Sequence, residues 1–263
     1  MRSDWIIHSP VIVLRIFFHI RNNYQSFPCF APLFETGSFL KREIFMKQIA
    51  VLLSGCGYLD GAEIRESICT LLALDSHPVD VHLFALNENQ KEVINTLSGQ
   101  AVSEQRNQLI ESARIARGQI KSLEECDPKS YDALVLPGGF GVAKNFCTFA
   151  FEGPKGSVHP LVKSKIETFY QNKKPIVALC IAPALLGMIF KNESFEMTLG
   201  PQGEAADALV SMGHKHHVCL TNEIHTDQSH KIISSPAYMY DDAKLSDVFS
   251  GIQKSIETLI EWL

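Results

Sequence analysis

The segment Pro175-Ile-Val-Ala-Leu-Cys-Ile-Ala-Pro-Ala-Leu-Leu186 predicts a short buried strand, a sharp turn at Cys180 and a helix that begins at once. This order is typical of a nucleophile elbow, in which the nucleophile lies between a strand and a helix. The chain nearly touches itself there, so the residues two positions to either side must be small, as Ala178 and Ala182 are. Cys180 is therefore the candidate nucleophile. The alternative is a buried core cysteine, a common state of free cysteines.

The helix that begins after Cys180 is expected to affect the ionisation of the Cys180 thiol. The backbone N–H groups of Ile181 and Ala182 are expected to point at the thiol, with the positive end of the helix dipole behind them. Such an environment favours the thiolate form of a cysteine.

Strands alternate with helices along the rest of the chain. Near-continuous apolar runs and alternating patterns predict strands at Gln48–Ser54, Val79–Ala85, Tyr131–Pro137, Phe195–Leu199 and His216–Leu220, and a hairpin at Asn222–Pro236. Helices are predicted at Ala62–Leu74, Glu88–Leu97, Ser103–Ala116, His159–Tyr170, Glu204–Met212 and Lys244–Leu263. Buried strands separated by helices indicate an α/β fold, a doubly wound and mostly parallel sheet with helices on both faces.

Composition limits the classes of function. The 263 residues are 46% hydrophobic and 20% charged, and no linker divides residues 46–263, which we expect to form one domain. A net charge of −5 without a basic block argues against nucleic-acid binding and favours small molecules or proteins as partners. The seven cysteines are odd in number and form no CxxC pair, so we expect neither disulfides nor a metal site, and a reducing, cytoplasmic location. The turn Gly55–Gly61 is not G-x-G-x-x-G, so no dinucleotide cofactor is expected.

Residues 1–45 differ in character from the rest of the chain. Their apolar run is interrupted by Arg15 and is too short to cross a membrane, which takes roughly 20 apolar residues. Lys41-Arg42-Glu43 can be encoded by a purine-rich stretch that resembles a bacterial ribosome-binding site just before Met46. We expect residues 1–45 to be a non-native upstream extension or a disordered segment, with Met46 as the true start; a targeting or membrane-surface segment is the alternative.

Three loops are expected to meet at the carboxyl edge of the sheet: the Gly55–Glu63 turn, the Pro137–Gly141 loop and the elbow. Cys180 would supply the nucleophile, and the amides of Gly139 and Ile181 an oxyanion hole. Glu63, at the start of its helix, would face the thiol and keep a proton in a partly dry pocket. The alternative for Glu63 is compensation of the helix dipole.

No histidine is placed as an obvious base. Position 181 is Ile where a Cys-His dyad would have His, and the Glu223-Ile-His225 order does not match a glutaminase triad. His214, His216 and His217 are interpreted as a solvated loop. Cys56, in the glycine-rich turn, is either a resolving thiol or a small residue in a tight bend.

Several motifs occur together in this order: Leu53-Ser-Gly-Cys-Gly-Tyr-Leu-Asp-Gly-Ala-Glu-Ile64, Pro137-Gly-Gly-Phe-Gly-Val-Ala-Lys-Asn145, Leu179-Cys-Ile-Ala-Pro183 and Ser235-Pro-Ala-Tyr-Met239. They resemble the ElbB family of isoprenoid biosynthesis-associated glyoxalases, within the PfpI-type branch of the class I glutamine amidotransferase-like superfamily. The resemblance covers residues 46–263. It implies a flavodoxin-like fold, Cys180 as nucleophile, Glu63 as its acid partner and the Gly138 and Gly139 amides facing the thiol, with Asn145 and Cys56 as auxiliary residues.

The resemblance also implies an activity. A glutathione-independent glyoxalase converts glyoxal or methylglyoxal to the hydroxyacid through a hemithioacetal on the cysteine, without a cofactor, and relatives commonly form homodimers. The robust glyoxalases of the superfamily carry a histidine that is missing here. The alternative is therefore a non-catalytic, redox-sensing or small-molecule-binding protein associated with isoprenoid metabolism. Ammonia release from glutamine would need a His-x-Glu partner that the sequence does not supply.

Overall fold

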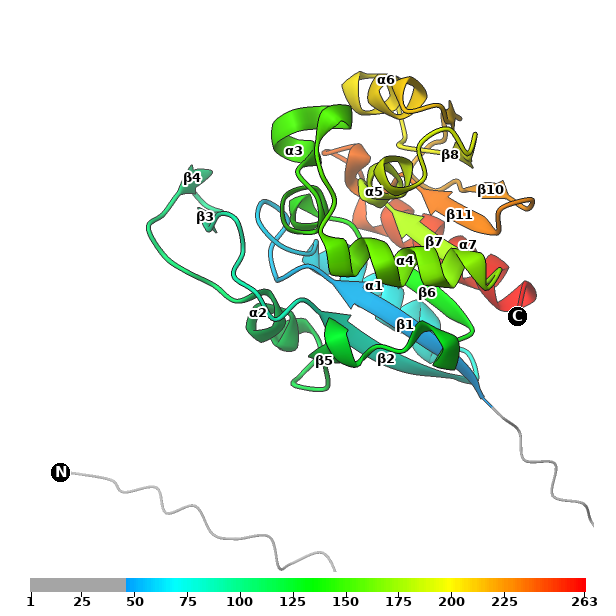
Figure 1. Ribbon diagram of the computed structural model, residues 1–263, viewed down its shortest axis with the longest axis horizontal. Coiled ribbons are helices and arrows are strands. Elements are labelled where there is room, and N and C mark those ends of the chain that lie inside the picture. The colour runs from blue at the N-terminus through cyan, green and yellow to red at the C-terminus, as the bar shows by residue number, and fades with distance from the viewer. Residues whose placement is uncertain (1–45) are drawn as a thin grey trace, which may run out of the picture. The chain divides into compact units, whose positions relative to one another are not determined.

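Seven strands form the central sheet of the computed structural model, which describes residues 46–263 (Figure 1). Their order across the sheet is β10-β11-β7-β6-β1-β2-β5, and every neighbouring pair is parallel except β10 and β11. The strands are β1 (Lys47–Leu53), β2 (Val79–Ala85), β5 (Lys121–Ser122), β6 (Ala133–Leu136), β7 (Ile176–Leu179), β10 (His225–Asp227) and β11 (Ile232–Ser235). The predicted doubly wound, flavodoxin-like α/β fold is confirmed.

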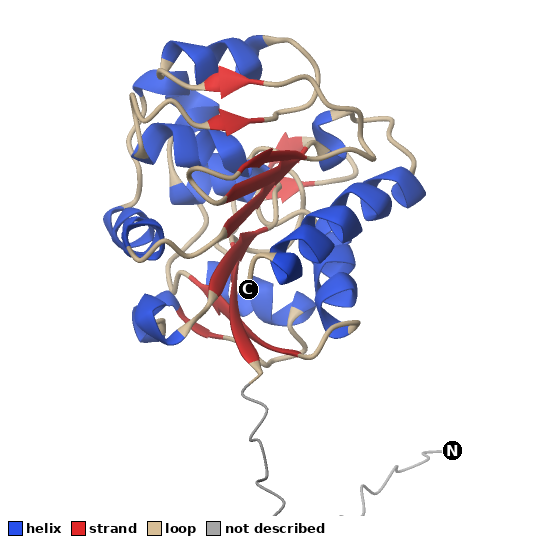
Figure 2. Ribbon diagram, turned by 90° about the vertical axis from the view of Figure 1, so that its right-hand side faces the viewer, coloured by secondary structure: helices blue, strands red, loops and turns tan. Residues whose placement is uncertain are grey.

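Helices cover both faces of this sheet (Figure 2). One face carries α4 (Pro160–Gln171) and α5 (Ala182–Ile189), and the other carries α1 (Ile64–Asp75) and α7 (Leu245–Glu261). The remaining helices are α2 (Gln108–Ile115), α3 (Phe149–Glu152) and α6 (Glu204–Ser211), with a π-helical turn η3 (Val142–Phe146) and 3₁₀ turns at η1 (Leu123–Glu125), η2 (Pro128–Ser130), η4 (Gly153–Lys155) and η5 (Ala237–Met239). Among the described residues, no helix is both long and apolar enough to cross a membrane.

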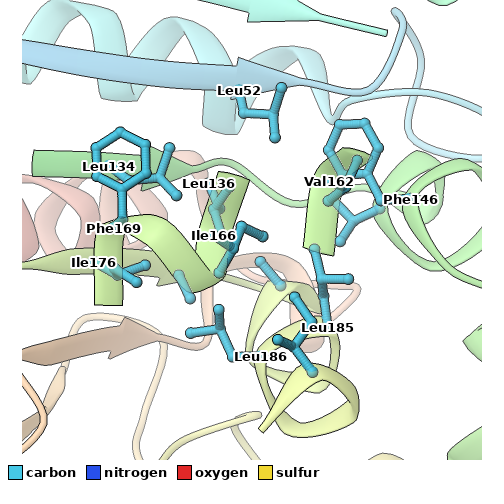
Figure 3. Close-up of a cluster of buried hydrophobic side chains, with 14 of the residues drawn as sticks. Leu52, Leu134, Leu136, Phe146, Val162, Ile166, Phe169, Ile176, Leu185 and Leu186 are labelled. Carbon is cyan, nitrogen blue, oxygen red and sulfur yellow. The ribbon is translucent and has the colours of Figure 1, made fainter. Parts of the chain in front are cut away.

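Strand alternation divides the core into two layers. On β1, Leu52 packs with the α4 and α5 side while Val51 packs with the α1 and α7 side, and both are buried. Side chains two residues apart point to the same face of a strand, so a strand buried on both faces needs an apolar residue at every position. Figure 3 shows the first of these layers, where sheet residues such as Leu134 and Ile176 lie among side chains of α4 and α5.

The structure corrects the prediction of a helix at Glu88–Leu97. That segment leads into a two-stranded hairpin of β3 (Ile94–Asn95) and β4 (Gln100–Ala101), seen at the left of Figure 1. Asn95 accepts backbone hydrogen bonds from Leu97 and Ser98 and so closes the turn, a local bond that competes with helix formation. The next helix is also shorter than predicted, because the side chain of Asn107 caps α2 at Ile110 N–H.

A second small sheet lies in the carboxyl-terminal half of the chain. It pairs β8 (Glu196–Met197) in parallel with β9 (Lys215–His216), and β8 also contacts β10. The predicted strand at Phe195–Leu199 is therefore present but short, whereas the strand predicted at His216–Leu220 is wrong beyond His216, where β9 ends. The prediction that His214 lies in a solvated loop is wrong, because His214 is buried and bonds to Phe195 N–H and the carbonyl of Gly187.

Candidate active site

Cys180 occupies a strained turn between β7 and α5. Its φ is +55°, a left-handed conformation that non-glycine residues rarely adopt. Its N–H donates to the carbonyl of Ser235 at the end of β11 (2.9 Å), which holds the turn against the sheet. Ala178 and Ala182 are fully buried on either side. Strained, non-glycine turns of this kind cluster at functional sites, and this one carries the thiol at the carboxyl edge of the sheet.

Glu66, not Glu63, faces this thiol. The Glu66 carboxyl group is completely buried and lies beside the Cys180 thiol, close enough that each group shifts the pKa of the other. Its two oxygens accept from separate backbone amides, Oε2 from Gly138 N–H (3.0 Å) and Oε1 from Tyr238 N–H (3.1 Å). The carboxyl group therefore links α1 to the loop after β6 and to η5, and the thiol lies beside it.

The start of α1 explains why Glu63 does not take this place. Glu63 has extended backbone angles and lies before the helix, where its Oε2 accepts the N–H of Glu66 at 2.6 Å. It is the N-cap residue, a role that satisfies one of the free amides of the first turn. Its own N–H donates to the carbonyl of Gly138 (3.0 Å), so it also ties the helix to the neighbouring loop. The expectation that Glu63 faces Cys180 is corrected accordingly.

Because Gly138 has no side chain, the loop after β6 can approach Cys180 and Glu66 closely. A Cβ on Gly138 would lie 2.4 Å from the Cys180 Cβ and 2.6 Å from Glu66 Oε2. Gly139 has a φ of +98°, and a Cβ there would lie 2.4 Å from the Glu63 nitrogen. These distances are far below van der Waals contact, so larger residues at 138 or 139 would push the loop away from the thiol.

Burial dominates the ionisation of the pair. It raises the pKa of Glu66 to about 8, with the negative charge of Glu63 adding to the shift. It also raises the pKa of the Cys180 thiol well above its ordinary value, and the charge of Glu66 acts in the same direction. The expectation that the helix start makes Cys180 a ready thiolate is therefore corrected, because desolvation outweighs the two amides that favour ionisation.

Those amides belong to Gly139 and Ile181, which hydrogen-bond the sulfur and lower the pKa of Cys180. One comes from the loop after β6 and the other from the start of α5. Two N–H groups directed at a reacting centre can stabilise an oxygen anion that develops next to the sulfur. The three predicted backbone contributors, Gly138, Gly139 and Ile181, thus all lie around Cys180, with Gly138 serving the carboxyl group.

The turn after β11 completes the site. Ala237 has a φ of +44°. The N–H of Tyr238 donates to Glu66 Oε1, and its hydroxyl accepts a hydrogen bond from the exposed Arg65 (3.1 Å). The Arg65 guanidinium also lies over the Tyr238 ring, 5.9 Å from its centre. The sequence alone assigned this turn no role, although Ser235-Pro-Ala-Tyr-Met239 is among the motifs that carry the resemblance.

The two auxiliary residues have other surroundings. Asn145 is buried, and its amide group donates to the carbonyls of Ser54 (3.1 Å) and Asp60 (2.9 Å) while its oxygen accepts from Lys91 N–H (2.9 Å). It braces the loop after β1, and these bonds occupy both of its donors. Cys56 is partly exposed in that loop and is a free thiol, and burial raises its pKa.

Comparisons with known proteins agree with this fold. The sequence profile of the DJ-1/PfpI family matches residues 58–201. The rat ES1 protein homolog, mitochondrial, is 38% identical over 81% of this chain and 83% of its own length. The human glutamine amidotransferase-like class 1 domain-containing protein 3, mitochondrial, is 38% identical over 81% and 82%. The crystal structure of an isoprenoid biosynthesis protein with an amidotransferase-like domain from Ehrlichia chaffeensis has a TM-score of 0.77 at 39% identity, over 82% of this chain and 99% of that one.

These names correct one expectation. Both curated relatives are named as mitochondrial proteins, which contradicts the cytoplasmic location expected from the cysteine content. An odd number of cysteines without CxxC pairs indicates a reducing environment and does not separate the two compartments. The expected non-native extension before Met46 falls on residues 1–45, outside the described residues.

Proposed function

The chain belongs to the DJ-1/PfpI family, and we propose that it is a glutathione-independent glyoxalase of the ElbB type, acting on glyoxal or methylglyoxal. The observation that supports this most directly is the buried Cys180–Glu66 pair, a nucleophile beside a carboxyl group whose pKa is about 8. A carboxyl group with a pKa near the working pH can both accept and return a proton. A glyoxalase needs one group that both accepts and returns a proton, because a proton must move between neighbouring carbons of the substrate.

The first step adds the thiol to the aldehyde. In the reactive state, Cys180 and Glu66 share one proton, which is on the thiol while Glu66 is ionised. Glu66 takes this proton as the sulfur attacks the aldehyde carbon. Glu66 then passes the proton to the aldehyde oxygen. The product is a hemithioacetal, and Glu66 is again ionised. The N–H groups of Gly139 and Ile181 stabilise the oxygen while its charge develops.

The second step is an internal oxidation and reduction. Glu66 removes the proton from the carbon bonded to sulfur, and an enediolate forms whose negative charge lies on the oxygen of the former neighbouring carbonyl. Glu66 then returns the proton to the neighbouring carbon, and the hydroxyl proton passes to the second oxygen. The carbon on sulfur is now an oxidised thioester carbon, and its neighbour is a reduced carbinol. No external oxidant or reductant is needed.

The third step is hydrolysis. Water adds to the thioester, the carbon–sulfur bond breaks, and the thiol of Cys180 is regenerated with its proton. The products are glycolate from glyoxal or lactate from methylglyoxal. Ionised Glu66, which lies beside the sulfur, can take the proton of the attacking water and then return it to the departing thiolate of Cys180.

A second candidate is a non-catalytic protein that senses oxidants or binds small molecules at Cys180, in association with isoprenoid metabolism. The observation that favours a non-catalytic role is the strongly raised pKa of the thiol, which leaves little thiolate at neutral pH for nucleophilic attack. Because oxidation also proceeds through the thiolate, this raised pKa favours small-molecule binding over oxidant sensing. The Ehrlichia chaffeensis protein is named as an isoprenoid biosynthesis protein, which supports the metabolic association but specifies no reaction.

The test is conversion of glyoxal and methylglyoxal to hydroxyacid by four proteins: the parent, Cys180→Ser, Glu66→Gln and Glu63→Gln. The proposal expects turnover in the parent, loss in the first two variants and retention in Glu63→Gln. If the parent is inert, or if Cys180→Ser turns over as the parent does, the glyoxalase proposal fails and the non-catalytic sensing or binding role is favoured.

A further inference from the structure

A cluster of three potential metal ligands lies around the small sheet, outside the site described above. Glu196 comes from β8, His217 directly follows β9, and His225 begins β10. Their ligand atoms all lie within 4.8 Å of one another. Glu196 Oε2 is 3.1 Å from His217 Nε2 and 3.7 Å from His225 Nε2.

These separations suit a tetrahedral ion. Zinc binds imidazole nitrogen at about 2.0–2.1 Å and carboxylate oxygen at about 2.0–2.2 Å, so ligand atoms around it lie about 3.3–3.5 Å apart. The two measured distances bracket that value. Two histidines and one carboxylate form a donor set that zinc and neighbouring divalent transition metals prefer.

Within residues 46–263, each of the two histidine nitrogens lies at ion-pair distance from Glu196 but forms no hydrogen bond. The Nε2 atoms of His217 and His225 are shielded from solvent, and in that part of the chain neither has a hydrogen-bond partner of acceptable geometry. Shielded polar atoms in native proteins usually have a partner, so two such atoms beside one carboxylate oxygen call for an explanation. A cation between these atoms supplies one.

Neighbouring groups orient Glu196 but leave one of its oxygens facing the histidines. Lys215 Nζ lies 2.8 Å from Oε1, and the backbone N–H of Glu196 donates to Asp227 Oδ2 at 2.9 Å. The oxygen that faces the histidines is therefore Oε2, which is available as a single ligand atom. Such surrounding contacts typically fix the orientation of metal ligands.

We propose that Glu196, His217 and His225 bind one divalent transition-metal ion of the zinc class, with water completing its coordination. The ion would link β8 to both ends of the 217–225 loop. The histidine rings stack in parallel at 3.8 Å with an angle of 9°, so a single ion cannot lie in both ring planes. Binding therefore requires one imidazole to rotate about its Cβ–Cγ bond. The exposed fractions of the His217 and His225 side chains, 40% and 20%, leave room for this.

The experiment is equilibrium dialysis of the full chain against Zn²⁺ at neutral pH. The parent is compared with His217→Ala, His225→Ala, Glu196→Gln and a control, His82→Ala, which removes a partly exposed histidine on β2. We expect one ion per chain in the parent and the control, and an affinity at least tenfold lower in each of the other three. Circular dichroism of each variant establishes that it is folded. Absence of bound zinc in the parent, or equal binding by all four variants, overturns the proposal.

The visible and near-ultraviolet spectrum of bound Co²⁺ distinguishes cysteine ligands from histidine and carboxylate ligands. An ion held by nitrogen and oxygen shows visible d–d bands without the near-ultraviolet sulfur-to-metal charge transfer that thiolate ligands produce. The proposal expects visible bands that disappear in His217→Ala and His225→Ala and persist in Cys180→Ser. Strong charge transfer that persists in both histidine variants would assign the metal to cysteines and contradict the site.

Discussion

The carboxyl group of Glu66 lies beside the thiol of Cys180 and accepts a hydrogen bond from the backbone N–H of Gly138 at 3.0 Å. One carboxyl group thus both anchors the loop and contacts the sulfur. Its second oxygen accepts from Tyr238 N–H, so both oxygens have backbone donors. The position of the carboxyl group is fixed by the fold rather than by its partner thiol.

We predict that Glu66→Gln loses the proposed activity and that Glu63→Gln retains it. Glutamine at 66 cannot transfer a proton, so activity should fall at least ~100-fold. Its NH₂ group would also face one of the two backbone N–H donors that now bond to the carboxyl oxygens, so stability should fall by about 1–3 kcal/mol. Glutamine at 63 keeps an oxygen for the cap, and stability should change by less than about 0.5 kcal/mol. Steady-state kinetics and urea unfolding measure both. Equal loss of activity in the two variants would restore Glu63 as a candidate acid.

The pH dependence follows from the raised pKa of Glu66. The proposed reaction begins from ionised Glu66, so kcat/KM should rise as the pH increases through about 8. Glu63→Gln removes a negative charge that raises this pKa, so its profile should move to lower pH. A profile that is flat between about pH 6 and 9, or that does not move in Glu63→Gln, would contradict the assignment.

Stability should depend on pH through the same group. Folded Glu66 holds its proton up to about pH 8, whereas the unfolded carboxyl group releases it near 4.5. Between these values the folded state binds more protons, so the free energy of unfolding should fall as pH rises, by a few kcal/mol in total. The difference between the parent and Glu66→Gln, measured by urea unfolding from about pH 5 to 9, isolates this contribution. A difference that is independent of pH would contradict it.

Much of the fold could be predicted from the sequence because its buried strands, such as Ile176–Leu179, are apolar on both faces and its more exposed strands alternate apolar and polar residues. Val79–Ala85 was predicted with the bounds that the structure has. The error at Glu88–Leu97 arose where polar residues bond locally, since Asn95 forms a turn that a helical pattern does not reveal. The short strands β8 and β9 are defined by pairing between distant segments, which no local pattern sets.

The candidate site was less accessible from the sequence. The turn at Cys180 is predicted by small residues at fixed spacing, and the structure has it there. Choosing between Glu63 and Glu66 requires the first residue of α1, and the extended backbone of Glu63 moves that start to Ile64. Element boundaries are the least predictable part of a sequence-based assignment. The cluster of metal ligands forms only when β8, β9 and β10 come together.

Gly138→Ala tests how closely the loop must approach the thiol. The added methyl group would overlap Cys180 Cβ and Glu66 Oε2, so we expect a loss of about 1–3 kcal/mol and at least a ~10-fold fall in activity. The matched control is Gly203→Ala, where an added Cβ meets nothing within 4 Å and the backbone is extended. Urea unfolding and kinetics compare the two. Normal activity in Gly138→Ala would show that the loop can move away without harm.

Asn145→Ala tests whether the loops around the site depend on a single side chain. The change removes three hydrogen bonds and leaves the carbonyls of Ser54 and Asp60 without their donor in a buried place. Each unsatisfied buried group costs about 1–3 kcal/mol, so we expect a total loss of at least about 2 kcal/mol. The control is the exposed Asn89→Ala, which should change stability by less than about 0.5 kcal/mol. If Asn145 only braces these loops, the folded variant should keep its kcat and show a raised KM, because the loop after β1 carries Cys56 and leads into α1. A folded variant with normal KM and a lost kcat would instead place Asn145 in the chemistry.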